Sequence, residues 1–450
     1  MKNKIERAGW LLIFLLCSLQ ACKKQLEAKP DQQLATPEKT ADLQAILDYS
    51  PVMFPEPSAD EGSADNYYLK DANLNGFSDQ ANKRIYTWDK DHFFDGFGSD
   101  WGIAYRKIYA CNTVLDALKE KPAAAGPQSA DLKGQALFRR AKTFWHIANT
   151  WAGLYEAATA KTDLGIPLRL DANYQQVSVR ATVQQTYDRI ISDLIESLPL
   201  LPMVAVSPTR PSKPAAFAML ARVYLSMRNY TQAKLYCDST LAVFPALIDY
   251  NDLNAGAAFP FPMLNAETII YNTAGSILIT PSYAKMDTVL YASYTADDLR
   301  KTIFFKSLGG KLYSFKGSYC GNSDHFCGLA TDEVYLTRAE CLAREGKTAE
   351  ALQDLNTLLV KRFKTGTFVP VTAADAPAAL VKILEERRKE LPMRFTRWLD
   401  LKRLNKDGAG IVLQRLVSGQ LYELLPNSPR YLLPLPEDVI ALTGMPQNPR

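Results

Sequence analysis

The stretch FAMLARVYLSMRNYTQAKLYCDSTLAVFP, residues 217–245, carries the clearest structural pattern of this chain. Its apolar residues recur at the spacing of amphipathic helices. Small residues stand at Ala221 and Ala233, where they let two antiparallel helices approach closely, and larger residues fill the flanks. Helical spacing alone is weak support, but together with these small residues it predicts a helix–turn–helix hairpin.

The same positions agree with a known repeat pattern. With Phe217 numbered as position 4, positions 4, 7, 8, 11, 20 and 32 of a tetratricopeptide repeat are occupied by Phe217, Leu220, Ala221, Tyr224, Ala233 and Pro245. Cys237 and Thr240 depart from the consensus. A second unit, VYLTRAECLAREGKTAEALQDLNTLLVKR at 334–362, repeats the pattern with Gly346 at the turn. The sequence therefore predicts a mainly α fold built on a tetratricopeptide-like helical scaffold.

The rest of the chain divides into helical and irregular segments. Periodicity and cap residues predict helices at 40–49, 101–120, 131–152, 182–198 and about 376–391. Residues 50–100 and 246–330 lack a helical period and predict long loops with short strands. Because long loops on a rigid scaffold usually carry binding, we expect these two insertions to form a ligand-binding face.

The N-terminus indicates export. Residues 11–30 read LLIFLLCSLQACKKQLEAKP, and the apolar run is too short to span a bilayer. Basic residues precede the run, and Leu19-Gln20-Ala21-Cys22 resembles the lipobox of bacterial lipoproteins. The sequence predicts a signal peptide at 1–21, lipidation of Cys22, and a polar tether at 22–34.

Charge and composition narrow the function classes. The net charge is +4, and removal of 1–21 takes away three basic residues and one acidic residue, leaving +2. No long basic run is present, which argues against a nucleic-acid partner.

We find no G-x-S-x-G, H-E-x-x-H or Walker motif, and the sequence predicts a protein that is not an enzyme. Asp95 and Asp100, in FFDGFGSDW, are the best-placed carboxylates among aromatic residues.

Two further patterns bear on cysteines and metals. Cys320 and Cys327 bracket the loop CGNSDHFC, where a small disulfide and two free thiols are both open interpretations. With His325 they lack the four ligands of a zinc site.

DANLNGFSDQAN at 71–82 matches several calcium-loop positions but has Asn82 where the bidentate Glu belongs. We expect no cofactor and no metal, with calcium as the one open alternative.

Aromatic residues with polar neighbours gather in the two insertions. Because sugar rings present flat C–H faces edged by hydroxyls, a binder needs exposed aromatic platforms beside polar groups. Trp88 is the best single candidate, whereas Trp101, at helical spacing with Tyr105, belongs to the core. The candidate ligand-binding residues are Tyr67, Tyr68, Trp88, Asp89, Phe93, Phe94, Tyr283, Tyr291, Tyr313 and Tyr319.

Several segments together resemble one family. ILEERRKELPMRFTRWLDLKRLN at 383–405 and YLLPLPEDVIALTGMPQNPR at 431–450 are similar to the hallmarks of the SusD/RagB lipoproteins. KPDQQLATPEKTADLQAILD, WGIAYRKIYACNTVLDAL and DEVYLTRAECLAREGKTAEALQDLN resemble the family's N-terminus, early helix and late repeat, in that order. The resemblance divides the mature chain into an N-terminal region at 35–245 with binding loops at 50–100, an insertion at 246–330, and a C-terminal region at 331–450.

The resemblance implies a function and a location. SusD-like members are helical outer-membrane lipoproteins that bind glycans, or peptides in RagB-like branches, and deliver them to a SusC-like, TonB-dependent transporter. We therefore expect a non-catalytic nutrient receptor anchored in the outer membrane, and the alternative is a tetratricopeptide-type protein-interaction scaffold. Two features depart from the family: no acidic cluster follows Cys22, and Met393-Arg394-Phe395 replaces Phe-Glu-Gly. Glu386, Arg387, Arg388 and Glu390 are expected to form helical ion pairs of the scaffold.

Overall fold

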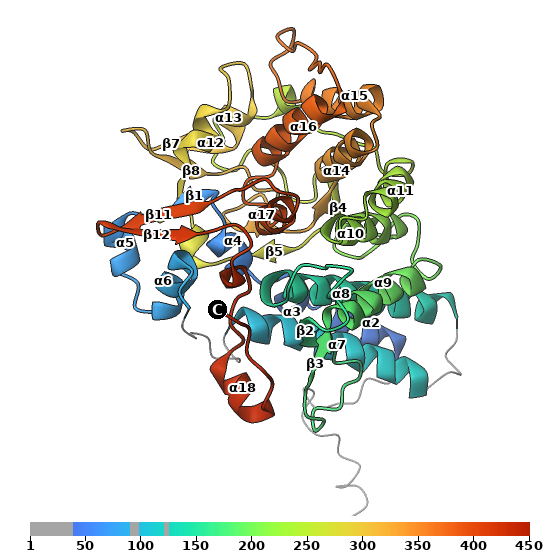
Figure 1. Cartoon of the computed structure of the whole chain (residues 1–450). Coiled ribbons are helices and arrows are strands. Elements are labelled where there is room, and N and C mark those ends of the chain that lie inside the picture. Colours follow the sequence, from blue (N-terminus) through green and yellow to red (C-terminus); the bar gives the residue numbers. More distant parts are fainter. Residues whose placement is uncertain (1–38, 91–98, 121–125) are drawn as a thin grey trace, which may run out of the picture. The chain divides into compact units, whose positions relative to one another are not determined.

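The computed structural model describes residues 39–90, 99–120 and 126–450 (Figure 1). The chain divides into two compact units, Met1–Leu43 and Gln44–Arg450, and the boundary falls within helix α2 (Thr40–Asp48). All that follows concerns Gln44–Arg450. The predicted signal peptide, Cys22 and the tether lie outside the described residues.

Helices that pack in sequence order form the scaffold (Figure 1). In the N-terminal half of the scaffold each helix packs on the next one in sequence. Helix α11 (Tyr230–Leu241) packs on α14 (Thr331–Arg344), although residues 246–330 lie between them in the sequence. α14 then packs on both α15 and α16. The scaffold helices are α7 (Asp100–Glu120), α8 (Pro127–Trp151), α9 (Val183–Ser197), α10 (Lys213–Ser226), α11 (Tyr230–Leu241), α14 (Thr331–Arg344), α15 (Thr348–Leu359), α16 (Ala376–Glu390) and α17 (Arg397–Lys406).

The two predicted hairpins form for the predicted reason. Ala221 of α10 and Ala233 of α11 are buried, so the helices meet without large side chains between them. Asn229 caps α11 by accepting a hydrogen bond from the Gln232 N–H. In the α14–α15 hairpin the turn is made by Gly346 at φ +79°, a conformation that glycine adopts without steric cost. The predictions of a mainly α, tetratricopeptide-like fold and of its helix positions are confirmed.

The two insertions contain short elements. The 50–100 segment is more helical than predicted, because Pro51 at the start of α3 and Asp79 as the cap of α6 support short helices that a periodicity window misses. Its elements are α3 (Ser50–Met53), α4 (Ala59–Ser63), β1 (Tyr67–Tyr68), α5 (Asp71–Asn75) and α6 (Gln80–Thr87). Those of 246–330 are η3 (Tyr250–Asp252), β4 (Thr268–Ile270), β5 (Thr273–Ala274), η4 (Ile277–Ile279), β6 (Lys285–Met286), α12 (Thr288–Ala292), α13 (Arg300–Ile303), β7 (Phe305–Ser307), β8 (Tyr313–Phe315), β9 (His325–Phe326) and β10 (Leu329–Ala330).

All the sheets are two-stranded and antiparallel among the described residues. Four of them, β4–β10, β5–β9, β7–β8 and β1–β6, involve the insertions, and β1–β6 joins one insertion to the other. The remaining elements are β2 (Leu164–Pro167) with β3 (Arg180–Thr182), β11 (Leu413–Val417) with β12 (Gln420–Leu424), η5 (Pro429–Tyr431) and α18 (Glu437–Thr443). No described helix combines the length and apolarity that a membrane span requires.

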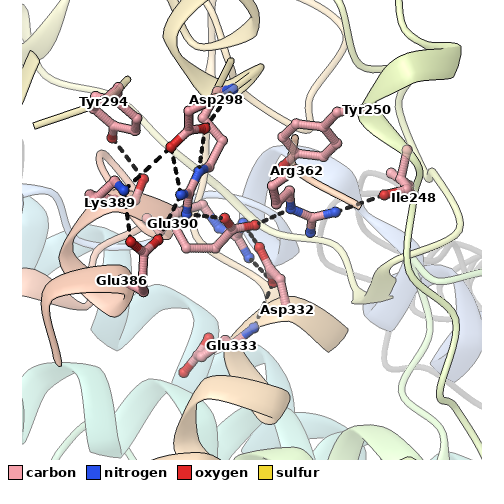
Figure 2. Close-up of polar contacts among 12 residues, drawn as sticks. Ile248, Tyr250, Tyr294, Asp298, Asp332, Glu333, Arg362, Glu386, Lys389 and Glu390 are labelled. Carbon is pink, nitrogen blue, oxygen red and sulfur yellow. Dashed lines mark hydrogen bonds and ion pairs between the residues drawn. The ribbon is translucent and has the colours of Figure 1, made fainter. Parts of the chain in front are cut away.

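Charged side chains of the hallmark helix α16, among them Glu386 and Glu390, lie close to Asp298 of the 246–330 insertion (Figure 2). The Arg362 guanidinium binds the carboxylates of Glu390 (2.6 Å) and Glu267 (2.8 Å). Arg300 binds Glu390 (3.0 Å), and also Asp298 (2.7 Å). All five side chains are fully buried. These ion pairs therefore join separate segments of the chain through its core.

The prediction that Glu386, Arg387, Arg388 and Glu390 pair with one another within α16 is wrong. Glu386 does pair with Lys389 one turn away, but it also binds Arg300. Arg387 binds Asp400 of α17, and Arg388 binds Asp65. The difference arises because this helix is packed on several elements, so its charges meet partners from distant segments rather than solvent.

The hallmark continues into a tight corner. Phe395 has a φ of +60°, in the left-handed region that favours glycine, and it stands where the resembled family has Gly. Its N–H donates to the Glu61 carboxylate (3.0 Å), and its ring is buried. The pKa of Glu61 is about 7, raised chiefly because burial disfavours its charged form. At this corner the hydrogen bond from the Phe395 N–H to Glu61 holds the backbone in a conformation that glycine would adopt without steric cost.

Candidate functional site

The β1–β6 ladder brings the two insertions together. Tyr67 pairs with Met286 and Tyr68 with Lys285, and the Asn66 carbonyl accepts a hydrogen bond from the Asp287 N–H. Side chains of successive strand residues point to opposite faces. Accordingly Tyr67 is buried, whereas Tyr68 is half-buried and reaches the surface. Aromatic residues far apart in sequence therefore meet at this ladder.

A second tyrosine lies just before β6. The ring of Tyr283 packs edge-on against Phe77, with 5.3 Å between ring centroids. The Asn73 side-chain amide lies 3.5 Å from the Tyr283 carbonyl. The Lys285 ammonium donates to the carbonyls of Ser282 (3.0 Å) and Tyr283 (3.3 Å). These contacts fix the chain around Tyr283.

The third feature is a stacked pair of tyrosines. Tyr291 of α12 and Tyr313 of β8 lie nearly parallel, at 15°, with 3.4 Å between ring centroids. Phe305 packs edge-on against Tyr291 at 5.5 Å, and the Lys301 ammonium lies 5.0 Å from the Tyr291 centroid. Both tyrosines are half-buried. Tyr291 is thus held on several sides and supports the ring of Tyr313.

We call Tyr68, Tyr283, Tyr291 and Tyr313 the tyrosine face. Burial raises the pKa of Tyr291, and its hydrogen bond with Tyr313 adds to the shift. Burial likewise raises the pKa of Tyr68, helped by the carboxylate of Asp287. The hydroxyls of Tyr291 and Tyr68 therefore stay neutral near pH 7. Fixed neutral rings with hydroxyl edges can stack on a flat apolar ligand surface and hydrogen-bond its rim.

Three predicted site residues are instead part of the core. Trp88 is only 2% exposed, packs with Trp398 and Leu413, and donates its indole N–H to the Ser63 carbonyl (2.9 Å). Tyr67 is buried, and its hydroxyl donates to the Gly62 carbonyl. Tyr319 is buried, and its hydroxyl donates to Glu267 (2.6 Å). The predictions of ligand platforms at these three residues are wrong, because the rings are enclosed by distant segments.

The other predicted residues have different outcomes. Asp89 is half-buried at the end of α6, where its carbonyl accepts a hydrogen bond from Arg450. Phe93, Phe94 and Asp95 lie outside the described residues. Asp100 accepts hydrogen bonds from the N–H groups of Ser58 (2.6 Å) and Ala59 (2.7 Å), so it caps α4. Phe77 and Lys301 were not predicted, although Lys301 lies in the same insertion as Tyr291.

Cys320 and Cys327 are free thiols in the structure, so the disulfide interpretation is wrong. The Cys320 thiol hydrogen-bonds with Ser318 and Tyr271. Burial raises the pKa of the Cys327 thiol, which lies near Lys142 and Glu56. Burial raises the pKa of the Cys320 thiol as well, so both thiols stay protonated near pH 7.

The 71–82 segment folds as two short helices. Asp71, Asn73 and Asn75 all belong to α5, and residues two apart on a helix point about 200° away from each other. Asp79 accepts from the Ala81 N–H (2.8 Å) and caps α6. This arrangement does not gather the predicted calcium ligands around one point. Within the described part of the chain no cluster of three or more His, Cys, Asp or Glu side chains is placed to hold a metal.

The described part of the chain thus combines a helical repeat scaffold with loop insertions that bring aromatic residues together. Two family models match the chain: "Starch-binding associating with outer membrane" over residues 24–225 and "SusD family" over residues 331–449. This chain belongs to the SusD/RagB family.

Known relatives share the fold over most of the chain. SusD-like protein P2 of Formosa agariphila is 24% identical, with 70% of this chain and 73% of that protein covered. A SusD superfamily protein of Bacteroides thetaiotaomicron has a TM-score of 0.73 at 19% identity, covering 92% of this chain and all of that one. A laminarin-binding SusD-like protein has a TM-score of 0.66 at 16% identity, covering 91% and 98%. None of these descriptions names an enzyme.

Proposed function

We propose that this protein is a non-catalytic receptor that binds oligosaccharide or polysaccharide at its tyrosine face. The observation that carries the proposal is the stacked pair Tyr291–Tyr313, which lies beside the β1–β6 ladder because β8 packs on β6. Sugar rings have flat C–H faces that pack on aromatic rings, while their hydroxyls bond to polar groups at the rim. Tyr313 offers such a ring, and Tyr291 behind it holds the ring in place.

Family membership supports the choice of ligand. One matched family model is described as starch-binding, and a protein of the same fold is described as laminarin-binding. In this proposal Cys22 carries the lipid that anchors the protein in the outer membrane, and a SusC-like, TonB-dependent transporter receives the glycan. A peptide cargo, as in RagB-like proteins, is the alternative within the family. A peptide library in the same binding screen distinguishes the two.

Replacement of Tyr313 by alanine should weaken glycan binding about tenfold, because it removes a stacking contact worth roughly 0.5–1.5 kcal/mol beyond the buried area. The Tyr313→Phe variant keeps the ring and should lose much less. Calorimetry with laminarin and starch on residues 23–450 measures both. Equal affinity of the wild type and Tyr313→Ala for a bound glycan would contradict the proposed site. The wild type should also release no reducing ends from its ligand.

Replacement of Cys22 by serine should release the protein from the outer membrane. The reason is that acyl chains add about 0.8 kcal/mol of membrane affinity per buried methylene, and serine accepts no such chain. Membrane fractionation of cells that express each form measures the effect, with Cys17→Ser inside the predicted signal as the matched control. Firm membrane retention of Cys22→Ser in cells lacking the transporter would contradict lipid anchoring.

A further inference from the structure

A groove at one end of the helical scaffold is not part of the tyrosine face. It lies between α7, the loop at 168–179 that joins β2 to β3, and α18, which come together at the lower edge of Figure 1. Its cavity volume is about 460 Å³, within the range of about 300–1,000 Å³ typical of small-molecule sites. A second hollow of about 590 Å³ shares Tyr105, Tyr109 and Val439 with it, so the two adjoin.

Aromatic rings on the walls of this groove become more exposed along α7. Trp101, Tyr105 and Tyr109 are spaced four residues apart, so they follow one side of the helix. Trp101 is 6% exposed, Tyr105 is half-buried, and Tyr109 is 52% exposed. Tyr174, from the 168–179 loop, is 81% exposed. The groove therefore has a fixed aromatic base and two tyrosines that solvent can reach.

The charged groups of the loop are used to hold the loop itself. The Arg169 guanidinium donates to the carbonyls of Gln176 and Asn173 and to the Ser178 hydroxyl. The Asp171 carboxylate accepts from the Asn173 N–H (3.0 Å). The Asn112 side-chain amide donates to the carbonyls of Arg169 and Asp171, which ties the loop to α7. The loop is thus held in place by its own contacts. Arg169 and Asp171, its one basic and one acidic residue, are both engaged in hydrogen bonds within the loop.

The remaining polar groups of the groove are neutral. Across the described residues, no hydrogen bond engages the side-chain amides of Gln175 and Gln176 or the hydroxyls of Tyr109 and Tyr174. Amides and phenols can both donate and accept, which suits a ligand made of hydroxyl groups. A phosphate or a carboxylate ligand would need an unoccupied cation, which this loop does not offer.

From this chemistry we propose that the groove is a second saccharide site, which binds a short neutral oligosaccharide by stacking on Tyr109 and Tyr174. The inference rests on the proposed function and adds to it, because a polysaccharide held at two places on one chain gains affinity by avidity. Short oligosaccharides cannot make use of that gain, so they report on each site separately.

The test is a titration of residues 23–450 with short oligosaccharides cut from laminarin or starch, followed by titration with the polysaccharide. The wild type should show two sites per chain. The Tyr109→Ala/Tyr174→Ala variant should show one, and its affinity for the polysaccharide should fall about tenfold. Tyr109→Phe/Tyr174→Phe keeps both rings and should retain most of the binding. Tyr49→Ala removes a tyrosine that is 57% exposed outside the groove and is the matched control.

The outcomes separate this inference from the proposed function. Unchanged stoichiometry and affinity in Tyr109→Ala/Tyr174→Ala, with weaker binding in Tyr313→Ala, overturns the groove site alone. Loss of all binding in Tyr313→Ala likewise overturns an independent groove site. Weaker binding in the groove variant alone supports the groove and rejects the tyrosine face. A wild type that binds none of the probes overturns both proposals. Thermal melts of the Tyr109, Tyr174 and Tyr49 variants should match the wild type, because these side chains are exposed.

Discussion

Replacement of Arg362 by methionine should lower the free energy of unfolding by about 3–5 kcal/mol, because it leaves buried Glu267 without its cation and Glu390 with Arg300 alone. The guanidinium touches Glu390 and Glu267, and also donates to the Ile248 carbonyl (2.7 Å) (Figure 2). Burial alone would lower the pKa of Arg362, but the two carboxylates hold it well above its usual value. The arginine is therefore always charged. Its replacement always removes one positive charge from beside the two carboxylates.

The effect of Arg362→Met should depend on pH. Burial raises the pKa of Glu267 to about 6 even in the intact protein, and removal of the arginine raises it further. A carboxyl whose folded pKa exceeds its unfolded value costs stability as pH rises through that window. Urea melts should therefore show a larger loss at pH 8 than at pH 5.

A surface pair of the same chemistry is the control for Arg362. Arg210 binds Asp48 at 2.5 Å, but both side chains are about one-third exposed. Arg210→Met should cost less than about 1 kcal/mol, since solvent screens exposed ion pairs. If both variants melt alike, the buried ion pairs do not support the fold as argued.

Replacement of Trp88 by alanine should cost about 3–5 kcal/mol of stability, as expected for a large side chain removed from a core. Three contributions add up in this loss: packing against Trp398, the hydrogen bond to Ser63, and the Arg415 guanidinium 4.6 Å from the ring centroid. Glycan binding at a temperature where the variant stays folded should be unchanged, because the ring has no surface to offer a ligand.

Trp88→Phe keeps most of the apolar volume and should lose clearly less stability than Trp88→Ala. Thermal melts and calorimetry on both variants, beside Tyr313→Ala, separate packing from binding. Normal melting of Trp88→Ala combined with weak glycan binding would show that Trp88 is a platform after all. The same pair of measurements would then remove the argument for the tyrosine face.

The helical scaffold could be predicted from sequence because its causes are local. The hairpins depend on Ala221, Ala233 and Gly346 at fixed spacing, and α9 starts at Thr182, where Gln185 completes a capping box. Helical periodicity and cap residues involve positions within one or two helical turns of each other, so they can be recognised in a short stretch of sequence. Family membership followed from motifs that are likewise contiguous, at 383–405 and 431–450.

The division of aromatic residues into core and surface was decided only by tertiary structure. Trp88 and Tyr313 both stand in irregular segments among polar neighbours, and the sequence ranked Trp88 first. Trp88 is enclosed by Ser63, Trp398 and Arg415, which come from three other segments. Tyr313 is placed beside Tyr291 by strand and helix packing. Outside periodic segments, burial depends on which distant chain covers a residue, and no local pattern records that.

The partners of charged residues follow the same logic. Sequence spacing in ILEERRKELPMRF indicates ion pairs within a helix, and the Glu386–Lys389 pair, one turn apart, obeys it. Arg387 and Glu390 instead meet Asp400 and Arg362, because packing removes solvent from that helix. Once solvent is gone, an unpaired charge becomes costly, and it takes the nearest opposite charge in space. The sequence alone thus determined which residues build the long scaffold helices, while tertiary packing determined which rings and charges remain at the surface for binding.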